Sequence, residues 1–296
     1  MNEMKPKISI IIANYNNGHF FKDCFDSLIA QTEKNWETII IDDCSTDDSI
    51  EVMKKMIEGD ERFKLIKNSK NFGIAKTSII GIENSTASIF ARLDPDDALK
   101  NNAIELSIKT HDEFPMVGLV YSNFVFCDDN LQEKNIHKTK QIHDLNEDYY
   151  GFRGEISHFA TFKKEFYFKT TGYDSFLRIA EDKDIYMKMC EVAPVKHIDE
   201  VCYKYRVHTG GISNFENVEK AIFWHWVAMI KMSERRGINL EELFVENYLP
   251  RNNYQDLEKK FETIRNSYQE LEMKFETINK SWLFKKLYSK GIFDKF

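Results

Sequence analysis

Three carboxylates stand within four residues of one another, at Asp94, Asp96 and Asp97, at the end of an apolar segment. Negative charges this close repel one another unless a positive charge lies among them. A hard divalent cation is the usual partner, and carboxylate oxygens suit Mg²⁺ or Mn²⁺. Taken alone, an acidic loop is more often a solvated turn than a metal site, so the metal hypothesis needs support from elsewhere in the chain.

A second acidic pair, Asp42 and Asp43, follows another apolar segment, Trp36–Ile41. If the two segments are parallel strands, both acidic groups lie at the carboxyl edge of the sheet, where open α/β sheets bind ligands. Carboxylates there can accept hydrogen bonds from a nucleotide base or from ribose hydroxyls while a cation holds the phosphates. The two acidic strand ends therefore predict a metal-dependent nucleotide site.

Three common catalytic or nucleotide-binding motifs are absent from the sequence. It has no GxxxxGK[ST] phosphate loop, no GxGxxG after a strand and no GxSxG nucleophile motif. The phosphates of a bound nucleotide would then be held by the cation rather than by a glycine-rich loop.

The apolar pattern of the first third of the chain predicts strands and helices in alternation. The β-branched run Ile8–Ala13 is typical of a strand buried on both faces, and His19–Gln31 carries apolar residues at helical spacing. The further predicted elements are strands at Trp36–Ile41, Phe63–Ile66 and Ile89–Leu93 and helices at Ile50–Ile57 and Ile74–Glu83. This alternation indicates βαβ units and a parallel sheet covered by helices, which is an α/β fold.

The rest of the chain follows a less regular pattern. Val117–Phe126 is predicted to be a strand, Asp182–Val192 a helix, and residues 216–246 helical. Asp128–Tyr150 is polar and is predicted to be a loop-rich excursion.

Composition and charge exclude several classes of protein. The 296 residues include 41 Lys and Arg against 48 Asp and Glu, a net charge of −7, which argues against a nucleic-acid binder. The five cysteines form no CxxC pair, as expected of reduced thiols. No signal peptide is recognised, and no apolar run approaches the ~20 residues of a membrane span. We therefore expect a cytoplasmic protein.

The segment from residue 7 to residue 51 resembles the opening of the family-2 GT-A glycosyltransferases. Like them, it has a strand ending in a small residue and Tyr-Asn, a helix closing on Ser-Leu-x-x-Gln-Thr, and a strand ending in Asp-Asp-x-Ser-x-Asp. Further matches are Asn71-x-Gly73, Leu93 to Asp97, Glu181-Asp182, and Tyr205 to His208 followed by Ser213. The resemblance covers about residues 7–213 and implies a GT-A fold, with a Rossmann-like, mostly parallel sheet flanked by helices.

The resemblance also implies roles at the nucleotide end of the site. Ala13 and Tyr15 would line the base, and Asp43 would accept a hydrogen bond from the uracil N–H. Within the acidic motif, Asp96 or Asp97 would ligate Mn²⁺ or Mg²⁺ while a neighbour, Asp94 or Asp96, meets the ribose.

Three further residues complete the site that the resemblance implies. Asp182 matches the catalytic base of the family, His208 would contact the metal or the diphosphate, and Arg206 would lie at the diphosphate. The expected reaction is an inverting, hexosyl-type transfer of one sugar from a nucleotide donor, most simply a UDP-sugar, to a glycan or lipid-linked glycan acceptor. Such a reaction would serve the assembly of a bacterial surface polysaccharide or glycoconjugate.

The expected transfer needs a carboxylate base and a cation. An acceptor hydroxyl becomes an effective nucleophile when a carboxylate takes its proton, and a cation stabilises the charge on the departing diphosphate. The QxxRW motif of processive members is absent after residue 182, which favours single additions. Ser78 and Ile79 stand where many members carry Arg-Asn, and Ile79 cannot hydrogen-bond.

Two other functions compete with this hypothesis. One is a catalytically degenerate transferase-like scaffold that acts through a coiled coil, a reading that Ile79 favours slightly. The other is a nucleotidyltransferase, which would consume a nucleoside triphosphate and release pyrophosphate.

The sequence divides into four predicted regions. A GT-A domain at 1–213 has a nucleotide-binding half, about 1–112, and an acceptor half, about 113–213. A helical extension at 214–250, a coiled coil at 251–282 and a basic amphipathic tail at 283–296 follow it.

The C-terminal region carries an unbroken heptad seam. Its apolar positions are Tyr254, Leu257, Phe261, Ile264, Tyr268, Leu271, Phe275, Ile278 and Trp282. This spacing predicts a homo-oligomer through 254–282, although a helix packed on its own domain is the alternative. Aromatic residues mixed with lysines at 281–296 favour a peripheral contact with the inner face of the membrane, or a cap over a groove on the same protein.

Overall fold

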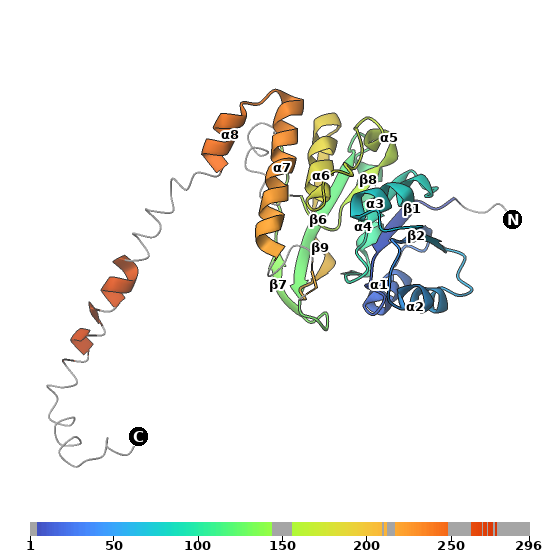
Figure 1. Ribbon diagram of the computed structural model, residues 1–296, viewed down its shortest axis with the longest axis horizontal. Coiled ribbons are helices and arrows are strands. Elements are labelled where there is room, and N and C mark those ends of the chain that lie inside the picture. Colours follow the sequence, from blue (N-terminus) through green and yellow to red (C-terminus); the bar gives the residue numbers. More distant parts are fainter. Residues whose placement is uncertain are drawn as a thin grey trace, which may run out of the picture. The chain divides into compact units, whose positions relative to one another are not determined.

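The computed structural model describes residues 5–143, 156–208, 210–211, 217–247, 262–267, 269–270, 272–274 and 276. The chain divides into two compact units, one ending at Leu240 and one beginning at Glu241. All the residues that form the candidate site belong to the first unit, which Figure 1 shows as a sheet with helices packed against it.

The N-terminal half of the first unit, which the sequence predicts to bind the nucleotide, is built from four parallel strands in the order β3-β2-β1-β4. These strands are β1 (Ile8–Asn14), β2 (Trp36–Asp42), β3 (Phe63–Lys67) and β4 (Ile89–Arg92). The helices between them are α1 (Phe21–Ile29), α2 (Ser49–Met56) and α3 (Ile74–Glu83). Every element predicted in this half is confirmed, and the alternation of strands and helices follows the predicted order.

The following half, which the sequence predicts to bind the acceptor, extends the same sheet in the order β4-β8-β6-β9-β5, with β7 paired to β6. Its strands are β5 (Ala98–Leu99), β6 (Leu119–Cys127), β7 (Glu133–His137), β8 (Thr161–Lys163) and β9 (Val195–Arg206). Its helices are α4 (Ala103–Glu113), α5 (Lys164–Tyr167) and α6 (Glu181–Val192). β8 is antiparallel to both neighbours, whereas β6 and β9 are parallel. The described chain thus forms one mixed, mostly parallel sheet, as the fold prediction required.

One prediction for this half was incomplete. The segment Asp128–Tyr150 was expected to be loop-rich, but it contains β7. β7 lies at an edge of the sheet with nearly all its residues exposed, so its sequence EKNIH shows no apolar alternation. Nothing in the local pattern therefore distinguishes it from a polar loop.

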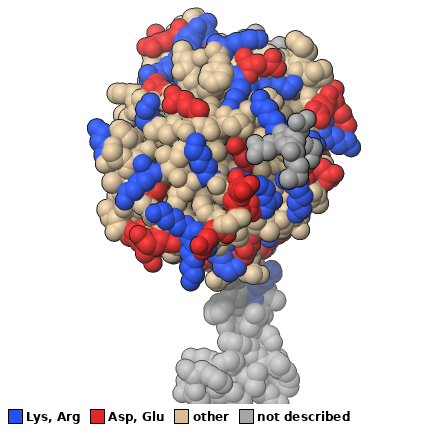
Figure 2. Space-filling model, turned by 90° about the vertical axis from the view of Figure 1, so that its right-hand side faces the viewer, with Lys and Arg blue, Asp and Glu red and all other residues tan. Residues whose placement is uncertain are grey.

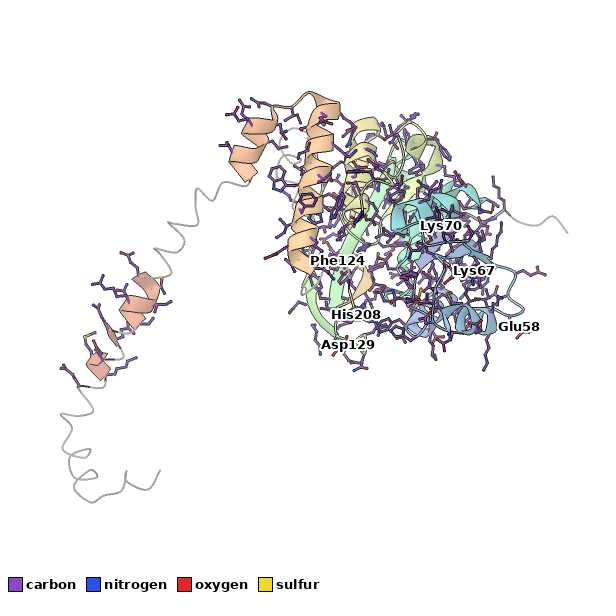
Figure 3. The ribbon with its side chains drawn as sticks, viewed as in Figure 1. Glu58, Lys67, Lys70, Phe124, Asp129 and His208 are labelled. Carbon is purple, nitrogen blue, oxygen red and sulfur yellow. The ribbon has the colours of Figure 1, made fainter. Side chains whose placement is uncertain are left out.

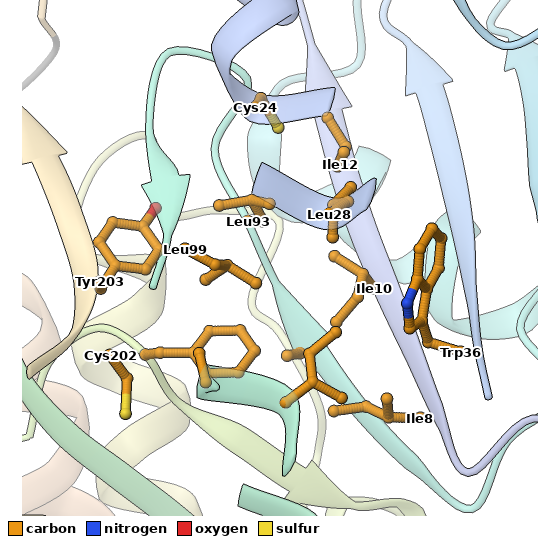
Figure 4. Packing of buried hydrophobic residues seen from close by; sticks show 14 of the residues in the cluster. Ile8, Ile10, Ile12, Cys24, Leu28, Trp36, Leu93, Leu99, Cys202 and Tyr203 are labelled. Atoms are coloured by element: carbon orange, nitrogen blue, oxygen red, sulfur yellow. The ribbon is translucent and has the colours of Figure 1, made fainter. Parts of the chain in front are cut away.

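The core surrounds β1, which is covered on both faces. Ile8, Ile10 and Ile12 pack in one cluster with Leu28 of α1, as Figure 4 shows. On the opposite face α3 lies so close that a Cβ atom at Gly81 would overlap the side chain of Ile11. Burial on both faces explains why the strand reads as a continuous apolar run.

The helical region after residue 216 contains two helices, α7 (Val218–Arg236) and α8 (Leu240–Asn247). α7 packs against α6 and belongs to the first compact unit, whereas the sequence-based division placed it in an extension. Gly237 ends α7 with φ of 65°, a left-handed C-cap that glycine adopts without strain.

The predicted coiled coil lies mostly outside the described residues. Those that are described within it, at 262–267, 269–270, 272–274 and 276, are helical, and Ile264 is the one seam position among them. The tail at 283–296 also lies outside the described residues. The coiled coil, the oligomer and the membrane contact remain predictions.

Two further properties concern the helices and the surface charge of the described chain. None of its described helices combines the length and the apolar content that crossing a bilayer requires. On the face shown in Figure 2, acidic and basic side chains are interspersed. That face offers no single-sign field to steer a charged partner.

A buried histidine joins α4 to β8. The Nε2 atom of His111 lies 2.9 Å from Oγ1 of Thr161, and the side chain is almost fully enclosed. Burial, helped by the charge of Lys163, lowers the pKa of His111 to about 4. A histidine in the unfolded chain has a pKa of about 6.5. Between this pH and the pKa of the folded state, the unfolded chain binds a proton at His111 and the folded chain does not.

We therefore expect His111 to make the fold less stable as the pH falls from 7.5 to 5.0. Its contribution to the loss of unfolding free energy over that range is about 2 kcal/mol. His111→Gln keeps a hydrogen-bonding group toward Thr161 but cannot titrate, so the variant should lose about 2 kcal/mol less than wild type. Urea denaturation at the two pH values measures this difference, and the exposed His143→Gln serves as the control. Equal pH dependence in wild type and His111→Gln would contradict the prediction.

Candidate active site

The carboxyl ends of β1, β2 and β4 meet at one edge of the sheet. Asn14 ends β1 and donates from its side chain to Asp42 at the end of β2, at 3.0 Å. Ser45 also donates to the Asp42 carboxylate, from its backbone N–H at 3.0 Å and from its hydroxyl at 2.5 Å. Asp42 is fully buried, so it fixes the shape of this edge rather than facing a ligand.

Asp43 organises the loop that leads into α3. Its carboxylate accepts hydrogen bonds from Asn68 Nδ2 at 2.7 Å and from the backbone N–H groups of Phe72 at 2.9 Å and Gly73 at 2.8 Å. Gly73 has φ of 82°, a conformation that glycine allows this loop to adopt. The predicted contact between Asp43 and a uracil N–H stays a prediction, and the carboxylate already holds the loop beside it.

Two exposed aromatic rings lie at the same edge. Tyr15, just beyond the end of β1, is 44% exposed, and Phe72 is 38% exposed with the ammonium of Lys70 5.2 Å from its ring centroid. Ala13, the other predicted base-site residue, is half-buried within β1. Ser78, at the position where many members of the family carry arginine, is buried in α3. The edge therefore has two exposed aromatic side chains where the sequence predicts a base.

The three acidic residues after β4 have different surroundings. Asp94 lies beside Arg92, with Nε 3.1 Å from its Oδ1. Asp97 is buried, and its two oxygens accept from the backbone N–H of Arg206 at 2.7 Å and from the hydroxyl of Tyr203 at 2.8 Å. Burial and the charges of Asp96 and Asp94 raise the pKa of Asp97 well above its usual range. Asp97, one of the two predicted metal ligands of this loop, thus points into the protein and anchors the loop.

Asp96 and His208 form a close pair at the same edge of the sheet. Asp96 Oδ2 lies 2.8 Å from His208 Nε2, with the two side chains 19% and 9% exposed. A carboxylate oxygen and an imidazole nitrogen suit Mn²⁺, and the carboxylate also suits Mg²⁺. Within the described residues no group of three or more His, Cys, Asp or Glu side chains gathers as a metal site. A cation here would complete its coordination with phosphate oxygens and water, as Mg²⁺ commonly does.

Arg206, predicted at the diphosphate, has its guanidinium inside the protein. Nε donates to the backbone oxygen of Asp96 at 2.6 Å, Nη2 to Asp23 at 2.7 Å and Nη1 to the backbone oxygen of Asp129. The guanidinium carbon lies 4.7 Å from the ring centroid of Phe20. Figure 3 labels His208 and Asp129 at this end of the sheet. Arg206 therefore joins α1, the acidic loop and the β6–β7 turn.

Asp182, the predicted base, lies in the first turn of α6. Ala180, two residues before Asp182, is the N-cap of α6 and has φ of 64°, a left-handed conformation that directs the chain into the helix. The enclosed position of Asp182 opposes ionisation, but the charges of Arg92 and His158 outweigh it and lower its pKa. Asp182 is thus held as a carboxylate, the form that accepts a proton.

Glu181 and Arg92 form a buried ion pair beside this base. Burial raises the pKa of Glu181 to about 7, with the charge of Asp182 acting in the same direction and Arg92 opposing it. Arg92 therefore supplies positive charge to Asp94, Glu181 and Asp182 together.

Sequence reasoning missed three residues of this site. Arg92 ends an otherwise apolar strand two positions before Asp94, and that charge was a usable signal. His158 stacks on Tyr203, with ring centroids 4.6 Å apart and planes at 19°. His158 lies outside any helix or strand and Tyr203 lies on a strand rich in charged residues, so neither carries a local pattern that marks it.

A mostly parallel sheet with an acidic loop at its carboxyl edge and an ionised aspartate at the start of a neighbouring helix defines a GT-A protein. The sequence profile named Glycosyl transferase family 2 matches residues 9–169, more than half of the chain, and the chain therefore belongs to this family.

Its relatives agree with this assignment. A chondroitin synthase from Pasteurella multocida is 25% identical over 241 residues, which cover 79% of this chain and 24% of that protein. The chain thus spans about a quarter of the length of this synthase.

Solved structures share the fold. S. aureus TarS 1-349 in complex with UDP-GlcNAc matches with a TM-score of 0.61 at 16% identity, over 78% of this chain and 67% of that one. The mannosyltransferase PcManGT from Pyrobaculum calidifontis, in complex with GDP-Man and Mn²⁺, matches with a TM-score of 0.60 at 15% identity, over 99% and 89%.

The hydrogen bonds of the buried Arg206 guanidinium lead to a prediction about stability. Arg206→Ala should lower the free energy of unfolding by about 2–4 kcal/mol, because it removes a buried charge and strands the acceptors around it. Arg206→Lys should recover only part of this loss, since one ammonium cannot reach all three acceptors. Urea denaturation gives the values.

Asp23→Asn is the matched control, because this partner is 48% exposed and its ion pair should be worth less than about 1 kcal/mol. If Arg206→Ala lowered the free energy of unfolding no more than Asp23→Asn does, the contacts of Arg206 would not stabilise the fold.

Proposed function

We propose that this chain is an inverting glycosyltransferase that moves a single sugar from a UDP-sugar to a glycan or lipid-linked glycan acceptor. The observation that carries this proposal is the position of Asp182 in the first turn of α6, next to Glu181, whose ion pair with Arg92 joins this turn to Asp94 of the acidic loop. Family membership, the polysaccharide synthase among the relatives and the UDP-GlcNAc complex of TarS support it. Assembly of a surface polysaccharide or glycoconjugate is the corresponding process.

The reaction follows from the residues around Asp182. The carboxylate accepts the proton of an acceptor hydroxyl while that oxygen attacks the anomeric carbon of the donor. The bond from the anomeric carbon to the diphosphate oxygen breaks, and UDP leaves with the bonding electrons. Attack opposite the leaving group inverts the anomeric centre. Arg92 keeps Asp182 ionised before the reaction and balances charge around it afterwards.

Asp96 and His208 would hold a divalent cation at the diphosphate end of this site. When bound, Mn²⁺ or Mg²⁺ supplies positive charge that stabilises the departing diphosphate. The Mn²⁺ in the PcManGT complex supports this part of the proposal. We also propose a cytoplasmic location, self-association through 254–282 and peripheral membrane contact through 281–296.

Asp182→Asn tests the base. The amide cannot accept the proton, so kcat should fall by about 10²-fold or more while UDP affinity stays close to wild type. Sugar transfer from radiolabelled UDP-sugars, with Mn²⁺ present, measures the rate. Asp112→Asn, an exposed aspartate on α4, is the matched control and should retain full activity. Wild-type transfer by Asp182→Asn would rule out this assignment of the base.

Asp96→Asn and Asp97→Asn distinguish the metal ligand from the anchor. Asp96→Asn should weaken Mn²⁺-dependent UDP binding by about tenfold or more, since even outer-shell changes have effects of that size. Asp97→Asn should stay within about threefold of wild type, because an amide can still accept from Arg206 and face the Tyr203 hydroxyl. Calorimetric titration of UDP with and without Mn²⁺ measures both. Equal losses in the two variants would contradict this division of roles.

A further inference from the structure

The loop between β3 and α3 carries an aromatic ring and an ammonium group at the carboxyl edge of the sheet. The side chain of Phe72 is 38% exposed, and Lys70 Nζ lies 5.2 Å from the centroid of its ring. Among the residues that the structure describes, this ammonium has no carboxylate partner. The ring can therefore stack on a planar ligand, and the ammonium can donate a hydrogen bond to that ligand.

Asp43 holds this loop beside the ends of β1 and β2. Its carboxylate accepts from the backbone N–H groups of Phe72 at 2.9 Å and Gly73 at 2.8 Å, and its own N–H donates to the carbonyl oxygen of Asn14 at 2.7 Å. Asn14 precedes the exposed Tyr15, so Asp43 joins the two segments that carry the exposed rings. These rings follow β1 and β3, the strands on either side of β2.

Two positions of α3 that carry polar groups in many members of the family do not serve a base here. Ser78 is 1% exposed, and its hydroxyl lies inside the protein. Ile79 lines a cavity of about 210 Å³ together with Tyr167 of α5 and Thr170. A buried hydroxyl and an aliphatic side chain offer no hydrogen bond to a ligand at the edge, so the groups that hold a base must come from another segment.

The order of the strands places a base near the loop of Phe72. β4, which leads into the loop of Asp96, lies on the far side of β1 from β2 and β3. Neighbouring strands are about 4.8 Å apart, so the ends of β3 and β4 are separated by about 14 Å. A nucleotide with its diphosphate at Asp96 and His208 would therefore lie along the edge with its base toward β2 and β3.

We infer that Phe72 and Lys70 are the residues that select the base of the donor, an inference that rests on the proposed transferase function. The ring of Phe72 stacks on the base, and the ammonium of Lys70 donates to the O4 oxygen of uracil. Cytosine carries an amino group in place of that oxygen, and an ammonium group cannot accept a hydrogen bond from it. This chain thus holds the base from the loop before α3 instead of from Ser78 and Ile79.

Two ligands separate contacts with the base from contacts with the diphosphate: UDP, and ribose 5-diphosphate, which is UDP without its base. Calorimetric titration of both with Mn²⁺ present, on the full chain, gives the affinities. Phe72→Ala should weaken UDP binding by about tenfold, because it removes the stacking surface, and should leave binding of ribose 5-diphosphate unchanged. Phe72→Tyr keeps the ring and should restore UDP binding.

Phe114→Ala is the matched control for the ring. Phe114 is 40% exposed, and the ammonium of Lys196 lies 4.6 Å from its ring centroid, but it ends α4 and lies outside the candidate site. This variant should bind both ligands as wild type does.

Lys70→Met tests the hydrogen bond to the base, because it keeps an unbranched side chain over the ring but removes the donor. Wild type should bind UDP at least about tenfold tighter than CDP, and this preference should fall by about threefold or more in Lys70→Met. Lys196→Met is the control and should keep the preference of wild type.

The other outcomes overturn the inference in different ways. If Phe72→Ala bound UDP as wild type does, or lost UDP and ribose 5-diphosphate equally, Phe72 would not contact the base, and the proposed function would stand. A preference for UDP over CDP that Lys70→Met leaves unchanged would remove Lys70 from base selection. A wild-type chain that binds neither ligand would contradict the proposed function and the inference together.

Discussion

The geometry of the candidate site depends on one buried carboxylate, that of Asp97. One of its oxygens accepts from the backbone of Arg206 and the other from the Tyr203 hydroxyl. These two contacts fasten the loop after β4 to the end of β9. Because of that junction, Asp96 on the loop and His208 beyond β9 come within 2.8 Å of each other. The buried carboxylate of Asp97 therefore determines where the pair of Asp96 and His208 lies.

The balance of charge at the site depends on the buried guanidinium of Arg92. The guanidinium of Arg92 lies among Asp94, Glu181 and Asp182, and keeps the last of these ionised despite its enclosure. Such a cluster is tolerable in a protein interior only because each charge has a partner.

The sequence was sufficient for the N-terminal half of the fold, because β1, β2 and β4 are almost entirely buried. Runs such as Ile8–Ala13 leave little ambiguity, and the helices between them follow the 3.6-residue period. The C-terminal half of this sheet was harder to predict. β7 is exposed along its length, and β9 carries Lys, Asp, Glu or Arg at five of its twelve positions, with Cys202 and Tyr203 among its few buried residues. Strands of this kind are defined by their partners in the sheet, which a local pattern does not contain.

For the site, the resemblance supplied the residues but not their division of roles. Asp96 and Asp97 are adjacent and chemically identical. The contacts that distinguish them come from Tyr203 and Arg206, on a strand far along the chain. Arg206 likewise could not be placed from its type, because its acceptors come from α1, the acidic loop and the β6–β7 turn. Long-range contacts of this kind have no signature in a window of sequence.

The link between Asp97 and Arg206 spans 109 residues, and this has a consequence for the order of assembly. Contacts between neighbouring βαβ units close short loops and form early, whereas pairing of β5 with β9 must bring distant segments together. During synthesis from the N-terminus, the acidic loop leaves the ribosome well ahead of the groups that hold it. The nascent chain thus carries its three clustered carboxylates without their anchor until β9 emerges, and the ligand-binding edge is completed in a late step of folding.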